Sequence, residues 1–372
     1  MNIIYHLLRI ILGLIFIISG FVKAVDPKGL AIKLEEYFSP KVFDLEFLNH
    51  GNLVYAIVLI VLELILGFRI LFSHKLKSSY YGVLILCLIF GFLTFYSAYY
   101  QVVTDCGCFG DALKLSPWQS FGKDLILLLI DLILIIFLAK KTKKEQQDSY
   151  AYDAKPKYSP IKATLVILAM LPCFYYLYQG VFHEPLIDFR SYKIGADLKA
   201  EQAKIKANPA TYSTFFHLQN SKTKAQMDID QDSYMSKEIW KDSLWVIDDS
   251  KTSSKLIKEG YQSAINKFHV LDENGNEITQ SLIDSPKAIV LFVHHSASLA
   301  PATLAQYEAL MLKQKANLIL GVASNKKVFK QIKGAFMDEP AIETIARSIP
   351  FVLVLQNGKI IDKQNAKDYF GQ

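Results

Sequence analysis

Residues 3–22 read IIYHLLRIILGLIFIISGFV, and this stretch decides the fold of the first half of the chain. A bilayer core about 30 Å thick needs roughly 20 apolar residues in one helix. The stretch is too long for the apolar region of a cleaved signal peptide, so we expect a retained anchor. Comparable stretches at 52–72, 80–99, 119–139 and 162–181 predict five membrane-spanning helices in all.

The composition divides the chain into two unlike halves. The 372 residues have a mean hydropathy of +0.22, yet 20% of them are charged. Long apolar runs end near residue 181, and the remainder is mixed and polar, which fits two or three domains. The net charge of +6 comes mostly from lysines beside the apolar runs, so we expect a lipid bilayer as partner and no nucleic acid.

The lysines predict the orientation, because cytoplasmic loops of membrane proteins are rich in Lys and Arg. Residues 139–162, from the end of the fourth span to the start of the fifth, hold seven lysines, Lys140, Lys141, Lys143, Lys144, Lys155, Lys157 and Lys162. We therefore expect a cytoplasmic N-terminus and a periplasmic C-terminal half, in a protein of the bacterial inner membrane. The expected domains are a four-helix bundle at 1–140, a basic cytoplasmic linker at 141–161, a fifth helix at 162–181 and an extracytoplasmic region at 182–372.

The polar half predicts two parts, after a tether that begins at His183. A small β segment spans about 205–280, with a hairpin at 211–218 and 223–229. An α/β core spans about 284–366, with buried strands in KAIVLFVHH and NLILGVAS and a final hairpin around Asn357-Gly358. Its strand and helix order resembles the thioredoxin-like plan.

The thioredoxin resemblance implies a cis Ile349-Pro350 bond next to the redox site of that family. Redox-active members carry C-x-x-C after the first core strand, and the corresponding stretch here, HHSASLAP, has no cysteine. We therefore expect the fold without dithiol chemistry in this domain. His294 and His295 are neighbours at a strand end and point to opposite faces, which favours a structural or solvated role over a metal site.

The membrane half resembles the DoxX/MauE family of four-helix membrane proteins over about residues 1–140. The resemblance rests on RIILGLIFIISGFVKAVDP in the first span, LELILG in the second and DCGCFGD after the third. It implies disulfide or electron-transfer maturation of extracytoplasmic proteins for MauE-like members, and quinone-linked redox chemistry for DoxX-like members. The arrangement with a cysteine-free thioredoxin-like domain resembles DoxX proteins of Bacteroidetes-type bacteria. No cofactor is firmly implied, and a quinone stays open, while another membrane or periplasmic protein is the expected partner.

Cys106 and Cys108 are the candidate redox pair. Disulfides persist in an oxidising compartment, and Gly107 allows the bend that so small a ring needs. Strain in such a bridge favours the oxidation of partners, whereas flanking Asp105 and Asp111 disfavour a thiolate. A redox pair, a static bridge and a metal site all stay open, although two sulfurs are too few for a closed metal site. Cys87 and Cys173 lie within apolar spans, where small buried hydrophobic residues explain them.

Charged residues inside the spans form the second candidate site, because ionisable groups at membrane depth need partners. Arg9, Glu63 and Asp131 fall at similar depths, which predicts one buried cluster joining spans one, two and four. Such a cluster could transfer a proton, bind a quinone headgroup, or only hold the helices in register. Two functions follow from these sites: a membrane oxidoreductase component acting through the C-x-C pair, or a non-catalytic scaffold whose thioredoxin-like domain docks another envelope protein.

Overall fold

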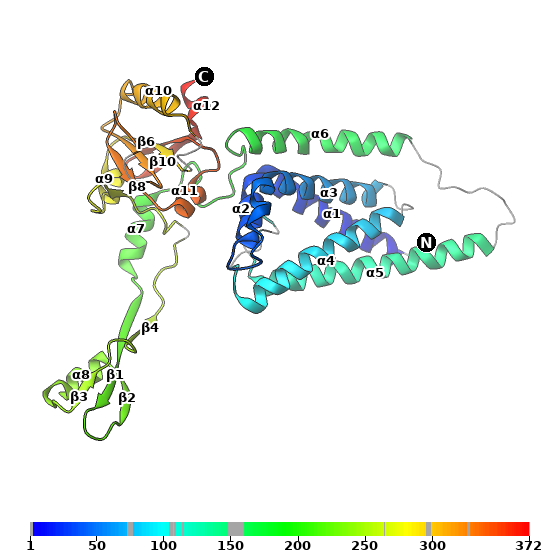
Figure 1. The fold of residues 1–372 in the computed structure, drawn as a ribbon. Coiled ribbons are helices and arrows are strands. Elements are labelled where there is room, and N and C mark those ends of the chain that lie inside the picture. Colours follow the sequence, from blue (N-terminus) through cyan, green and yellow to red (C-terminus); the bar gives the residue numbers. More distant parts are fainter. Residues whose placement is uncertain are drawn as a thin grey trace.

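The computed structural model describes residues 3–72, 77–103, 107, 109–113, 115–147, 160–263, 265–294, 299–325 and 328–371, without the side chains of 141–147. These residues form a bundle of long helices, a six-stranded α/β domain and a smaller four-stranded sheet that projects from it (Figure 1). A membrane α-helical region followed by a sheet-rich α/β domain is the predicted fold class.

The predicted spans form the helices of the bundle. They are α1 (Ile3–Val25), α3 (Asn52–Phe72), α4 (Lys77–Tyr100), α5 (Pro117–Gln147) and α6 (Pro160–Phe182). Among the described residues, four helical segments are long and apolar enough to cross a membrane: α1, α4, α6, and α3 together with the preceding 3₁₀ turn η1 (Glu46–Gly51). The helix α5 lies beside α4 and carries Lys123, Asp124 and Asp131, which lower its hydrophobicity (Figure 1).

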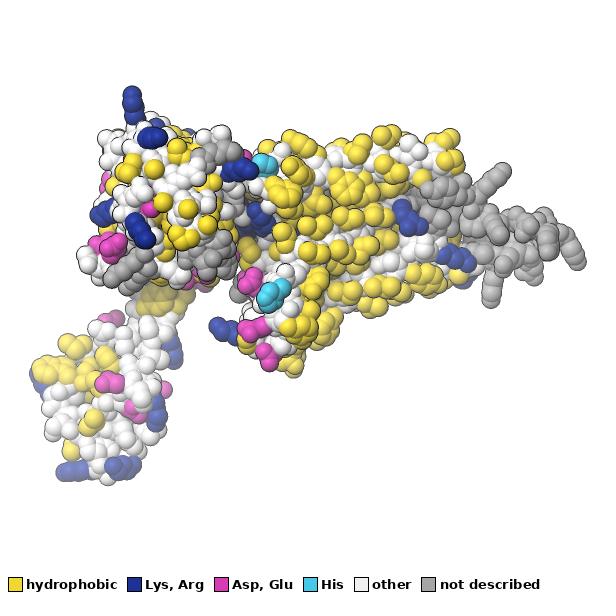
Figure 2. Space-filling model, turned by 45° about the horizontal axis from the view of Figure 1, so that its top comes forward, with side chains coloured by type: hydrophobic (Ala, Val, Ile, Leu, Met, Phe, Trp, Pro, Cys, Tyr) yellow, Lys and Arg dark blue, Asp and Glu magenta, His cyan; other side chains and the backbone are white. Residues whose placement is uncertain are grey.

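The flank of the bundle is apolar, as a lipid-facing surface must be. Ile3, Ile85, Ile126 and Ile167 are each more than half exposed on this flank. Figure 2 shows hydrophobic side chains covering the helices, with charged side chains gathered near the ends. So extensive an apolar surface indicates a membrane environment rather than water, and the protein is therefore a membrane protein.

Small residues bring α1 and α3 into close contact. A Cβ added at Gly67 would lie 3.0 Å from the backbone nitrogen of Ile17 and 3.1 Å from the carbonyl oxygen of Gly13. Helices in lipid associate through such close packing, because the lipid tails are as apolar as the helix surfaces. The helix α6 packs onto the same pair, where Met170, Cys173 and Leu177 join the cluster around Leu64.

A further helix, α2 (Pro27–Phe38), lies across one end of the bundle, within the connection between the first two predicted spans (Figure 1). Asp26 caps it by accepting a hydrogen bond from the Gly29 N–H at 2.9 Å, and Pro27 opens its first turn. We call this end of the bundle, which also carries residues 109–113, the domain-proximal end, because the α/β domain lies against it.

The α/β domain is built on a sheet with strand order β10-β9-β6-β7-β8-β5. Its strands are β5 (Leu271–Asp272), β6 (Ala288–Val293), β7 (Leu318–Ala323), β8 (Gly334–Phe336), β9 (Phe351–Gln356) and β10 (Lys359–Asn365). The strands β6, β7 and β8 are parallel, while β9 and β10 form an antiparallel hairpin beside β6. The sequence did not predict the short strand β8.

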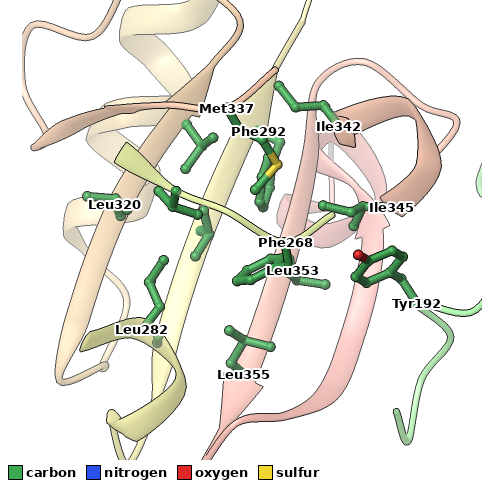
Figure 3. Close-up of a cluster of buried hydrophobic side chains, with 14 of the residues drawn as sticks. Tyr192, Phe268, Leu282, Phe292, Leu320, Met337, Ile342, Ile345, Leu353 and Leu355 are labelled. Atoms are coloured by element: carbon green, nitrogen blue, oxygen red, sulfur yellow. The ribbon is translucent and has the colours of Figure 1, made fainter. Parts of the chain in front are cut away.

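Helices cover both faces of this sheet. They are α7 (Leu198–Ala207), α9 (Thr279–Asp284), α10 (Pro301–Leu312), α11 (Glu339–Ile345) and α12 (Ala366–Phe370). Alternate residues of β6 enter two cores: Val290 and Phe292 pack with α11, and Ile289 and Leu291 pack with α10. Figure 3 shows the first core, which Tyr192 enters from the segment that follows α6. That segment is therefore part of the domain rather than a free tether.

The small sheet projects from the α/β domain as a separate lobe (Figure 1). It contains β1 (Thr211–Asn220), β2 (Gln226–Asp230), β3 (Trp245–Ile247) and β4 (Ser253–Lys258), with α8 (Gln231–Ser236) and the 3₁₀ turn η2 (Ile239–Lys241). The strands β1 and β2 pair antiparallel, as the expected hairpin requires.

Candidate functional site

The described residues beside the C-x-C motif, Gly107 and 109–113, lie at the domain-proximal end, and we call them the C-x-C turn. Cys106, Cys108 and Asp105 themselves lie outside the described residues, so their neighbours define the surroundings. Gly107 and Gly110 have positive φ angles, and the Gly110 N–H donates to the Gly107 carbonyl at 3.0 Å, which forms a tight turn. The Phe109 ring lies 5.2 Å from the Lys123 ammonium of α5.

Two helices flank this turn. A Cβ added at Gly107 would lie 3.1 Å from the Lys33 side chain of α2, and one at Gly110 would lie 3.5 Å from Val22 of α1. The described residues of the loop therefore rest on the ends of α1, α2 and α5.

Arg347 of the α/β domain joins the domain to this turn. Its Nε donates to Asp26 Oδ2 at 2.8 Å, and its Nη2 donates to Asp111 Oδ2 at 2.9 Å. Its side chain is only 10% exposed, so the charges are largely shielded from water. We call these two ion pairs the docking contact. Arg347 directly precedes Ser348 and the cis Ile349-Pro350 bond. The loop that leads into β9 therefore faces the C-x-C turn, because Arg347 on this loop binds Asp111.

Glu184 holds the same loop from the end of α6. Its Oε1 accepts hydrogen bonds from the N–H groups of Arg347 at 2.9 Å and Ser348 at 2.6 Å. Its Oε2 accepts from Arg190 at 2.7 Å. Burial alone would raise the pKa of Glu184, but the charges of Arg190 and Lys363 and the Ser348 hydrogen bond lower it to about 2.

Lys363 of β10 completes this network. Its ammonium donates to Asp188 Oδ2 at 2.5 Å and to the carbonyl oxygens of Tyr192 and Ile345, each at 2.7 Å. Burial and the nearby Arg190 charge lower the pKa of Lys363 to about 8. The network therefore fixes the segment after α6, and with it the bundle, to the loop that carries Arg347.

A small polar cavity lies within the bundle. Lys23 donates to Glu63 Oε1 at 2.6 Å and to Ser19 Oγ at 3.1 Å, with the Lys23 and Glu63 side chains each 3% exposed. Lys123 pairs with Asp124 at 2.6 Å. These groups line a cavity of about 20 Å³ that Cys87 and Phe90 also border. A space of this size is enough for about one water molecule.

The structure does not bring Arg9, Glu63 and Asp131 into one ion-pair cluster. Glu63 pairs with Lys23, while Arg9 Nη1 lies 3.5 Å from the Ile70 carbonyl oxygen. Asp131 is fully buried, and neither carboxylate oxygen has a hydrogen-bond partner among the described residues. The prediction assumed that charged residues at similar depths pair with each other. A lysine side chain, however, is about as long as one helical turn, so Lys23 reaches inward to Glu63 from the helix end.

The residues that our sequence reasoning missed are Arg347, Glu184 and the Lys123–Asp124 pair. Asp26 and Asp111 did carry a signal, since each lies in a motif of the DoxX/MauE resemblance. Arg347 also stands just before the predicted Pro350 loop. Nothing in the sequence indicated that the Pro350 loop contacts the two motifs that contain Asp26 and Asp111.

Two comparisons with known proteins match part of the chain. Residues 1–138 match the family described as methylamine utilisation protein MauE. Over 142 residues the chain is 29% identical to "Protein TlpB" of Flavobacterium psychrophilum, a match that covers 37% of each protein. No solved structure matches the chain. Together with the apolar helices, these findings indicate a membrane protein whose first 138 residues match the MauE family.

Proposed function

We propose that the chain is a membrane-anchored thiol–disulfide exchange component that acts through Cys106 and Cys108. In this proposal the domain-proximal end faces the periplasm of a bacterial inner membrane, as the lysines of the opposite loops favour. The observation that carries the proposal is the docking contact, in which Arg347 binds Asp111 at 2.9 Å, three residues after Cys108.

The position of the Arg347 loop supports this role. The thioredoxin resemblance implies that the loop before Pro350 borders the redox site of that family. Residues 183–372 contain no cysteine, yet this loop lies against the C-x-C turn of the bundle. The bundle therefore supplies the thiols, and the α/β domain supplies the surface beside them, to which a partner protein binds. The resemblance to DoxX and MauE proteins supports the same class of chemistry.

The exchange step transfers a disulfide to the partner. A partner thiolate attacks one sulfur of the Cys106–Cys108 disulfide, forming a mixed disulfide and releasing the other cysteine as a thiolate. The second partner thiolate then attacks the mixed disulfide. The partner gains a disulfide, and Cys106 and Cys108 are left reduced by two electrons.

Renewed oxidation of the pair requires a two-electron acceptor, and a membrane quinone is the class that the resemblance suggests. The cavity of about 20 Å³ beside Lys23 and Glu63 is too small for a quinone ring. A quinone would therefore have to bind elsewhere, and the exchange step does not depend on it.

The test uses the oxidised full-length chain in detergent and an excess of a reduced dithiol peptide. Alkylation and mass spectrometry should show about one peptide disulfide formed per chain, together with alkylation of Cys106 and Cys108. The variant C106S/C108S should form none. The variant C87S/C173S is the matched control and should retain full exchange. Equal peptide oxidation by C106S/C108S and the unaltered chain would refute the proposal.

A non-catalytic scaffold is the second candidate. The projecting small sheet favours it, because Tyr212, Val246 and Ile257 are each more than half exposed there. Under this alternative, C106S/C108S preserves function in cells, whereas deletion of residues 183–372 abolishes it. Under the proposed exchange function, C106S/C108S and the deletion of residues 183–372 should each abolish function in cells.

A further inference from the structure

His294 and two glutamates form a cluster that takes no part in the docking contact or the polar cavity. His294 directly follows β6, and its side chain is only 5% exposed. Glu339 and Glu343 lie four residues apart on α11, so both side chains project from the same helix face. Their side chains are 35% and 19% exposed, which leaves one side of the cluster open to solvent.

The distances in this cluster differ from those of the other histidine–carboxylate pairs in the described chain. His183, His217 and His269 approach their carboxylates to 2.7, 2.5 and 2.9 Å. His294 Nδ1 instead lies 3.6 Å from Glu339 Oε1 and 3.9 Å from Glu343 Oε1. One ligand atom from each of the three residues lies within 4.8 Å of the others.

These separations fit ligands that share one cation. Ligand nitrogen and oxygen atoms lie about 2.0–2.2 Å from a zinc ion, so two ligands of the same ion are about 3–4 Å apart. The spacing is too long for direct hydrogen bonds and short enough for an ion in between. We propose that His294, Glu339 and Glu343 bind a divalent first-row transition cation.

The ligand set narrows the class of ion. Imidazole suits zinc, iron and nickel, and carboxylates suit harder ions such as manganese, whereas Cu(I) prefers sulfur ligands. The two carboxylates balance the charge of a divalent ion. Three protein ligands with an exposed side leave a coordination position for water or another molecule. For His294, this proposal differs from the structural or solvated role that its sequence position favours.

The site also connects to the docking contact through the backbone. Arg347 Nη1 donates to the carbonyl oxygen of Glu343, so the helix that carries two ligands also supports the docking arginine. A bound ion would tie the end of β6 to α11, next to the loop that faces the C-x-C turn. The metal site nevertheless stands without the proposed exchange function, because none of its ligands is a thiol.

Zinc binding tests the site directly. The untagged full-length chain in detergent is stripped with a chelator and titrated with Zn²⁺ by calorimetry, and with Mn²⁺ in a parallel titration. We expect one Zn²⁺ per chain and a higher melting temperature in its presence. Because loss of a supporting outer-sphere residue already costs about 10–100-fold in affinity, H294A should weaken binding by at least that factor.

Two further variants separate binding from folding. E343Q keeps the size of the side chain and should also weaken Zn²⁺ binding, while its melting temperature without metal stays close to that of the unaltered chain. H269A removes a histidine that pairs with Glu277 on the domain surface and should bind Zn²⁺ normally. Absence of Zn²⁺ and Mn²⁺ binding, or equal binding by H294A and the unaltered chain, would overturn the proposal.

Discussion

Glu184 connects three parts of the molecule through one carboxylate. It follows the last membrane helix, accepts two backbone N–H groups of the Arg347 loop and pairs with buried Arg190. A buried carboxylate is stable only when its charge is neutralised and its oxygens accept hydrogen bonds. The anchoring of the α/β domain at this point therefore depends on Glu184 staying ionised.

Acid should weaken this anchor. The pKa of Glu184 is lowered from 4.5 to about 2 in the folded protein. Its contribution to stability is therefore complete above about pH 4.5 and is lost as the pH falls toward 2, with a size on the order of 3 kcal/mol at neutral pH.

The variant E184Q should lower the melting temperature at pH 7, and its difference from the unaltered chain should shrink steadily below pH 4.5. Thermal unfolding in detergent between pH 7 and pH 3 measures this difference. The exposed Glu259 supplies a control, since E259Q should change little at any pH. A difference that does not vary with pH would contradict the anchoring role.

The Lys23–Glu63 pair makes a second prediction at the residue scale. Removing one partner of a buried ion pair typically costs about 3–5 kcal/mol, because the other charge is left without compensation. K23M should therefore lower the melting temperature strongly, and K23M/E63M should recover part of the loss. K33M, which breaks the more exposed Lys33–Glu36 pair, should cost about 1 kcal/mol or less. Equal decreases in melting temperature for K23M and K33M would show that the buried Lys23–Glu63 pair contributes no more than the exposed one.

At the scale of elements, the helix contacts depend on glycines at the points of closest approach. Gly180 of α6 lies against the start of α2, where an added Cβ would meet Pro27 Cδ at 2.5 Å and the Val25 carbonyl oxygen at 2.6 Å. Backbone and ring atoms cannot move aside as a flexible side chain can. The last span therefore packs onto the domain-proximal end only because residue 180 lacks a side chain.

G180A should separate α6 from α2 at a cost of about 1–3 kcal/mol, the usual range for overpacking. G122A in α5 is the matched control, because nothing lies within 4 Å of its added Cβ. That change should be neutral or stabilise the helix by up to about 1 kcal/mol. Melting temperatures of both variants in the same detergent measure the difference, and equal shifts would count against the contact.

At the scale of the whole molecule, the docking contact decides how the α/β domain meets the bundle. R347A should free residues 109–113 and 345–350 from each other and so raise their rates of backbone hydrogen–deuterium exchange. K199A breaks an exposed pair with Asp284 within the α/β domain and serves as the control. Unchanged exchange in R347A would show that other contacts hold the domain in place.

Much of the fold could be predicted from the sequence because its signals are local. Twenty consecutive apolar residues specify a span, and alternating or continuous apolar runs with Asn357-Gly358 specify the strands and the final hairpin. The candidate C-x-C pair and its flanking aspartates could be found in the same way. The helix α2 was missed because its apolar face is short and lies within a charged stretch.

The sequence by itself determined the apolar spans, the buried strands β6 and β7, the final hairpin and the absence of cysteine from residues 183–372, because each depends on residues close together in the chain. Only the tertiary structure decided which charges meet. Glu63 binds a lysine 40 positions away, and Arg347 binds aspartates 321 and 236 positions away. Such pairings depend on how helices and domains pack, because a charged side chain in a low-dielectric environment binds the opposite charge within its reach.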